Sequence, residues 1–172
     1  MKRSALAACL AIGFLGSTAM LTAKEPAPGI NAKGAFARLK TLAGDWRMDL
    51  GGGPAMKAGS RITSGGSVVM ETLFAGTDHE MISMCHLDGD DLLMTHHCAA
   101  GNQPRLKLDR EASKPDRLSC AFVNGTNFDP SRDTYMHSGR MAFLGGGRIE
   151  SEWAAYKDGK KAGEHKFAMS RP

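Results

Sequence analysis

After its first 23 residues, the sequence has no apolar run long enough to cross a membrane and no run of basic residues. A membrane-spanning helix needs about 20 consecutive apolar residues, so we expect no integral membrane segment in the mature chain. Nucleic-acid-binding proteins gather Lys and Arg on one face, often interleaved with aromatic residues, and neither pattern occurs here. We therefore expect no nucleic-acid partner.

Catalytic motifs and paired cysteines are also missing. The chain has no Gly-X-Ser-X-Gly turn, no phosphate loop, no dinucleotide fingerprint and no Cys-X-X-Cys pair. Beyond the leader only Cys85, Cys98 and Cys120 remain. Cys85 and Cys98 fall at opposite ends of a predicted hairpin, out of disulfide reach at about 3.3 Å per residue. We expect three buried thiols, and the missing motifs favour a binding protein over an enzyme.

The first 23 residues are typical of a signal peptide. Lys2 and Arg3 precede an apolar stretch over residues 4–14, and Leu21-Thr22-Ala23 is a cleavage site, with Ser17-Thr18-Ala19 as the alternative. We expect an exported protein, either periplasmic or extracellular. Removing Lys2 and Arg3 lowers the net charge from +4 to +2.

What remains has the length of one domain. Residues 24–32 contain two prolines and no hydrophobic period, so they are interpreted as a flexible leader. Residues 33–172 then form a single domain. Phe36, Leu39 and Leu42 recur at three-residue spacing, which predicts a short helix over 33–43 that ends at Gly44.

The centre of the chain predicts a β-hairpin. Asp88-Gly89 lies between two apolar runs, and this pair favours a tight turn between strands 80–87 and 91–98. Side chains alternate along a strand, so Glu80 and Asp91 lie on the same face of the hairpin. This face is assigned to solvent. The other face carries His79, His96 and Cys98, which we expect to point inward.

Further strands follow at intervals of about ten residues. In the last third, Gly145–Gly147 forms a turn, and pairing Phe143 with Ile149 places Arg140 opposite Glu152. The predicted strands span residues 45–50, 56–63, 67–74, 80–87, 91–98, 105–109, 117–123 and 162–171, with the hairpin around Gly145–Gly147 in addition. About ten short antiparallel strands after one N-terminal helix predict an all-β, up-and-down barrel with space for a ligand inside.

The stretch Leu42-Ala43-Gly44-Asp45-Trp46, a Gly-X-Trp that enters the first strand behind a short helix, resembles the opening of the lipocalin-like calycin barrels. Within that group the chain is most similar to small secreted bacterial proteins without assigned activity, and more distantly to nitrobindin-type haem-binding barrels. Over residues 33–171 the resemblance implies a ten-stranded antiparallel barrel whose Trp closes one end. It also implies haem held by one inward His on a late strand, and His165 is the position that matches.

Three functions are open at this stage, besides haem binding. The first is an apolar small molecule held in an interior pocket by inward side chains, which we expect to be His79, His96, Cys98, Tyr135, His137, Trp153 and His165. The second is a copper or zinc site, since His79, His96 and Cys98 offer imidazole and thiolate ligands. The third is an enzyme with His137 as a base beside Tyr135.

Overall fold

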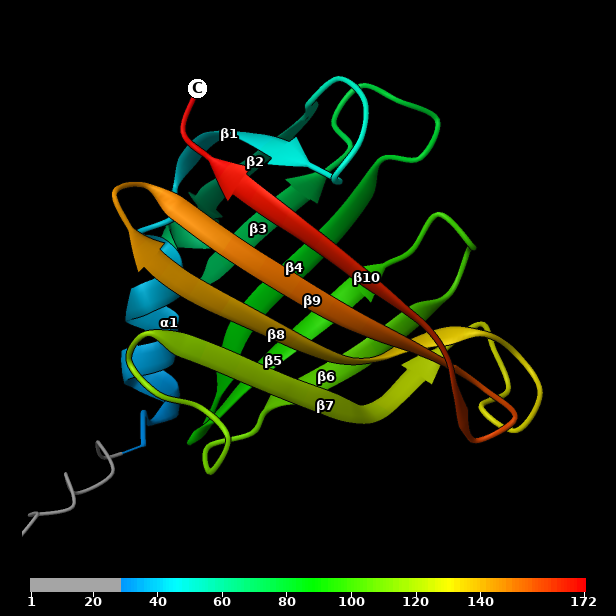
Figure 1. The fold of residues 1–172 in the computed structure, drawn as a ribbon. Helices are drawn as coiled ribbons and strands as arrows, with labels where there is room; N and C mark the ends of the chain where they lie inside the picture. Colours follow the sequence, from blue (N-terminus) through cyan, green and yellow to red (C-terminus); the bar gives the residue numbers. More distant parts are fainter. Residues whose placement is uncertain (1–28) are drawn as a thin grey trace, which may run out of the picture.

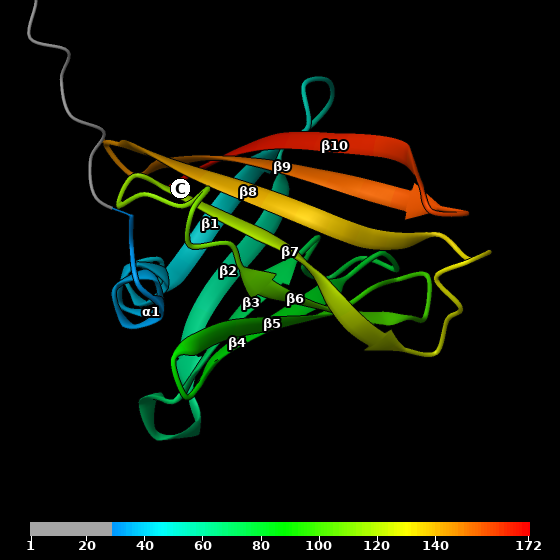
Figure 2. The same ribbon diagram turned by 90° about the horizontal axis from the view of Figure 1, so that it is seen from below.

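The computed structural model describes residues 29–172 as a closed antiparallel barrel of ten strands. Each strand pairs with its neighbours in sequence, and β1 pairs with β10 to close the sheet. The predicted fold class is confirmed, and this architecture is consistent with a calycin-like fold. Figures 1 and 2 show α1 at one end of the barrel, with β8, β9 and β10 together in one wall. The expected signal peptide and most of the expected leader lie outside the described residues.

The elements follow the predicted positions within a few residues. Residues 56–63 and the turn at Asp88-Gly89 match their predictions, whereas the strand predicted over 117–123 extends to Thr126. The elements are α1 (Ala32–Lys40), β1 (Gly44–Asp49), β2 (Met56–Thr63), a 3₁₀ turn η1 (Ser64–Gly66), β3 (Val68–Leu73), β4 (Met81–Asp88), β5 (Asp91–His97), β6 (Gln103–Leu108), β7 (Arg117–Thr126), β8 (Tyr135–Gly145), β9 (Arg148–Lys157) and β10 (Lys160–Ser170).

Helix α1 covers one end of the barrel, which we call the helix end. The Asn31 side chain accepts a hydrogen bond from Gly34 N at 2.8 Å and so caps the first turn. Ala35 and Phe36 turn inward and join the core. The helix lies against β3, β4 and β5, so it bounds the barrel interior on that side.

A clamp around Trp46 fixes the start of β1. The Trp46 indole Nε1–H donates to Leu42 O at 2.8 Å, and the Arg171 guanidinium lies 4.0 Å from the centre of the Trp46 ring. Arg171 also donates to the carbonyls of Thr41, Ala43 and Asp45. The first and last segments of the barrel are therefore joined by one side chain, as well as by the β1–β10 ladder.

The β8–β9 hairpin has the predicted register with two local shifts, one beside the turn between Phe143 and Gly145 and one near the start of β8. Phe143 pairs with Ile149, and Arg140 forms an ion pair with Glu152 on the outer face, as expected. Between Met136 and Ser138 the register shifts, so His137 is an additional residue in β8. Pairing between β7 and β8 ends at Ala121 and Ser138, and beyond this point the two strands separate towards the end opposite the helix, which we call the far end.

The wall beside β10 is also incomplete near the far end. Strand β1 pairs only with the last three residues of β10, Ala168 to Ser170. The earlier part of β10 therefore has a free edge, which carries exposed Lys160, Lys161 and Lys166. Lysines on a free edge disfavour pairing with another chain. None of the helices within residues 29–172 has the length and apolar character needed to span a bilayer.

Candidate functional site

A row of polar side chains crosses the inner face of four neighbouring strands. Ser60 on β2 pairs with Glu71 on β3, Glu71 pairs with Ser83 on β4, and Ser83 pairs with His96 on β5. Paired residues in an antiparallel sheet share a face. Ser83 and His96 are 1 % and 3 % exposed, whereas Ser60 and Glu71 are half-buried.

Ser83 joins the two titratable members of the row. Its Oγ lies 3.0 Å from His96 Nδ1, and its hydroxyl also hydrogen-bonds to the Glu71 carboxyl. An ionised carboxylate only accepts hydrogen bonds, so Ser83 then donates to Glu71 and accepts from the Nδ1–H of His96. This arrangement leaves His96 Nε2 as an acceptor, and it has no partner among the described residues.

Burial shifts the pKa values of Glu71 and His96 in the directions that favour their neutral forms. Desolvation raises the pKa of Glu71 to about 7, and the Ser83 hydrogen bond opposes this only in part. Desolvation lowers the pKa of His96 to about 4, with a smaller contribution from neighbouring His97. Between pH 4 and 7 the linked residues Glu71, Ser83 and His96 are therefore all neutral.

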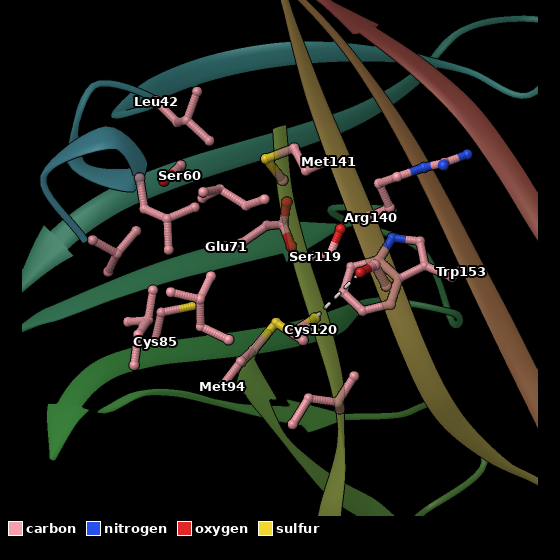
Figure 3. A pocket seen from close by; sticks show the side chains of 17 residues that line it. Leu42, Ser60, Glu71, Cys85, Met94, Ser119, Cys120, Arg140, Met141 and Trp153 are labelled. Carbon is pink, nitrogen blue, oxygen red and sulfur yellow. Dashed lines mark hydrogen bonds between the residues drawn. The ribbon is translucent and has the colours of Figure 1, made fainter. Parts of the chain in front are cut away.

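Glu71 faces a cavity in the barrel interior (Figure 3). Its volume is about 70 Å³. Pockets for drug-sized molecules have about 300–1,000 Å³, and an engineered cavity of about 150 Å³ binds benzene. This cavity is therefore suited to a much smaller molecule. Apolar side chains form most of its wall, among them Leu39, Leu42, Val69, Leu92, Met94, Leu106, Leu108, Leu118, Met141 and Trp153.

Trp153 forms part of the opposite wall. It pairs with Gly139, where a Cβ would lie only 2.5 Å from the indole Cζ3, so glycine leaves the space that the ring occupies. The ring also stacks near His96, with 6.1 Å between ring centres. Among the described side chains, Trp153 Nε1 and Ser60 Oγ are buried polar atoms without a hydrogen-bond partner. Both residues line the cavity.

Two thiols complete the wall. Cys85 is buried and Cys120 half-buried, and Cys120 Sγ donates to Gly139 O at 3.6 Å. Burial raises the pKa of Cys120 to about 12 and that of Cys85 further still. Since thiolates are the reactive form, both thiols are unreactive at neutral pH.

The predicted pocket residues divide between this cavity and the far end. Trp153 lines the cavity, and His96 lies beside it. Tyr135 and His137 instead join an aromatic cluster in the gap between β7 and β8. Tyr135 lies 4.7 Å from Phe122, and His137 stacks on Tyr156 at 3.9 Å between ring centres.

Three other predicted residues differ from the inward placement we expected. His79 is exposed, because it lies in the loop before β4, where strand alternation no longer applies. Cys98 is half-buried in the turn after β5 and does not line the cavity. His165 is opposite Trp153 but exposed, because it lies on the part of β10 that has no β1 partner.

These positions also bear on the proposed metal and haem ligands. Within residues 29–172, no three His, Cys, Asp or Glu side chains are grouped closely enough to hold a metal ion, so His79, His96 and Cys98 do not form the expected set. His165 does not contribute to the cavity wall, and the cavity volume of about 70 Å³ does not fit a haem. The described residues therefore fit neither the expected metal ion nor a haem.

Glu71 is the site residue that the sequence analysis missed. The pattern that could have revealed it is Val69-X-Glu71-X-Leu73, where strand alternation places a carboxyl on the same face as two apolar residues. Both apolar neighbours are buried.

No model of a known protein family and no curated protein sequence matches this chain.

Proposed function

We propose that this protein is an exported β-barrel that binds a small, mostly apolar molecule in its interior cavity. The observation that carries the proposal is an apolar cavity with one carboxyl and two unpartnered polar atoms in its wall. Ligand sites in proteins have this composition, with an apolar surface for affinity and a few polar groups for orientation. The leader residues Lys2 to Ala23 and the resemblance of Gly44-Asp45-Trp46 to secreted calycin-like barrels support export.

The size of the cavity limits the ligand. At about 70 Å³ the interior holds a molecule of only a few heavy atoms, unless side chains move. Met94 and Met141 line the cavity, and their unbranched side chains change rotamer readily. A somewhat larger ligand is therefore accommodated by moving these two side chains, without opening the sheet.

A pair of cavity variants tests the proposal. Leu118 is buried and lines the cavity, so Leu118→Ala enlarges the space, whereas Val69→Phe on the opposite wall fills it. Val123→Ala is the control, because Val123 lies on the same strand as Leu118 and is exposed. Binding is followed by NMR of ¹³C-methyl-labelled methionines, with ethanol and benzene as probes.

The wild type should bind ethanol and exclude benzene. Leu118→Ala should admit benzene, Val69→Phe should bind neither, and the control should match the wild type. If no probe shifts the Met94 or Met141 signals in the wild type or in Leu118→Ala, the interior is not a ligand site. Mass spectrometry of the protein recovered from a secreting host should show a chain that begins after Ala23 or Ala19, and an intact leader would contradict export.

A further inference from the structure

The Glu71 carboxyl lacks a charged partner inside the barrel. No Lys, Arg or His side chain among residues 29–172 forms an ion pair with it. The nearest candidate in the cavity wall, Arg140, directs its guanidinium away from the cavity and pairs with Glu152 (Figure 3). Buried charges in proteins are usually paired, so an unpaired carboxyl in a cavity wall is an unfilled position for a cation.

The other titratable groups around Glu71 provide no positive charge. Cys85 on β4 and Cys120 on β7 are protonated, neutral thiols, and the Glu71 carboxylate disfavours their ionisation. His96 on β5 reaches Glu71 only through Ser83 and remains neutral above about pH 4. From the helix, Arg38 is occupied by stacking on Phe143, with 4.2 Å between its guanidinium carbon and the ring centre.

We propose that the cavity binds a small organic amine and that the Glu71 carboxylate holds its ammonium group. This inference rests on the proposed function, since it assumes that the cavity is a ligand site. A carboxylate has about four acceptor positions, and Ser83 uses one of them. Ser60 Oγ, on the neighbouring strand, can accept a second N–H of the ammonium.

The rest of the wall favours the same class of ligand. The Trp153 ring lies in the cavity wall opposite Glu71 (Figure 3), and an indole face attracts a cation. The leucine and methionine side chains accommodate the alkyl part. A ligand carboxylate would be repelled by Glu71, and a pure hydrocarbon would leave it unpaired. The cavity volume restricts the alkyl part to a few carbons.

The test compares ethylamine with ethanol, which has the same shape and no charge. Met94 and Met141 methyl signals report occupancy of the cavity by either molecule. At pH 8 the wild type should bind the amine at least tenfold more tightly than the alcohol. Glu71→Gln keeps the shape of the side chain and should abolish this preference while it leaves ethanol binding unchanged. Glu150→Gln, an exposed position on β9, should behave as the wild type.

A measurement on the wild type alone makes the test independent of the stability of the variant. With a pKa of about 7, Glu71 is about 90 % ionised at pH 8 and about 1 % at pH 5. Ethylamine affinity should therefore fall by about 90-fold between these pH values, whereas ethanol affinity should not.

The possible failures are distinguishable. Equal affinity for amine and alcohol at pH 8, in both the wild type and Glu71→Gln, would overturn the amine inference and leave the cavity function intact. Amine binding that does not change between pH 5 and pH 8 would overturn it as well. Binding of neither molecule would overturn the proposed function and, with it, the inference.

Discussion

Replacing Glu71 by Gln should change how the stability of the protein depends on pH. In the folded protein the pKa of Glu71 is raised from 4.5 to about 7. Between these values the folded state holds a proton that the unfolded state has lost. The free energy of unfolding therefore decreases as pH rises from 4.5 to 7, by at most about 3 kcal/mol at about 1.4 kcal/mol per pKa unit. Water in the cavity would reduce this value.

His96 has the opposite effect over nearly the same range. Its pKa falls from 6.5 to about 4, so between these values the unfolded state holds a proton that the folded state lacks. The free energy of unfolding then increases as pH rises from 4 to 6.5, again by at most about 3 kcal/mol. In the wild type the two contributions cancel between pH 4.5 and 6.5.

Glu71→Gln removes the contribution of Glu71 to the pH dependence of stability and leaves that of His96. The variant should gain stability relative to the wild type as pH rises from 4.5 to 7, by up to about 3 kcal/mol, and the difference should then stay constant. Urea unfolding followed by tryptophan fluorescence at pH 4.5, 5.5, 6.5 and 7.5 measures it. Glu150→Gln, at an exposed position, should show a constant difference from the wild type. If the Glu71→Gln difference is equally constant, Glu71 titrates as a solvated group and the argument for a desolvated carboxyl is refuted.

Two further changes test contacts that hold the site in place. Arg171→Ala removes the cation over Trp46 and three donated hydrogen bonds, and should lower the free energy of unfolding in urea by about 1–2 kcal/mol. Arg171→Lys should recover only part of this loss, because an ammonium group lacks the planar fork of a guanidinium. Gly139→Ala places a methyl group 2.5 Å from Trp153, and should cost about 1–3 kcal/mol and alter the near-ultraviolet circular dichroism. Gly163→Ala, with open space around it, is the matched control, and an equal loss in both variants would argue against close packing at Gly139.

Local signals in the sequence account for most of the fold. Asp88-Gly89 predicts the turn between β4 and β5, and strand alternation predicts which residues of the two strands share the inner face. Gly89 adopts the positive φ, +57°, that such a turn needs. The pairing of Phe143 with Ile149 could be predicted in the same way, from the short turn between β8 and β9.

Exposure near strand ends could not be predicted from alternation. Alternation places His165 on the face of Trp153, and the structure pairs the two residues. However, β1 ends at Asp49 and leaves that part of β10 open to solvent. The sequence around His165 does not show how long β1 is, because β1 lies at the other end of the chain. The inward prediction for His79 is wrong for a similar reason. It extends the alternation two residues beyond Met81, where β4 begins, into the preceding loop.

The polar row shows why half of the site could be predicted and half could not. His96 could be placed on the inner face from the hairpin alone, because side chains alternate along its two strands, and Ser83 shares that face. Glu71 joins them only through the pairing of β3 with β4, and a seven-residue connection separates these strands. A loop of that length permits several registers, and a slip of one residue would turn Glu71 to the outer face. The register that the barrel adopts therefore decides whether this carboxyl is a solvated surface group or the one acidic group in an apolar cavity, and the pH dependence of Glu71→Gln measures which of the two it is.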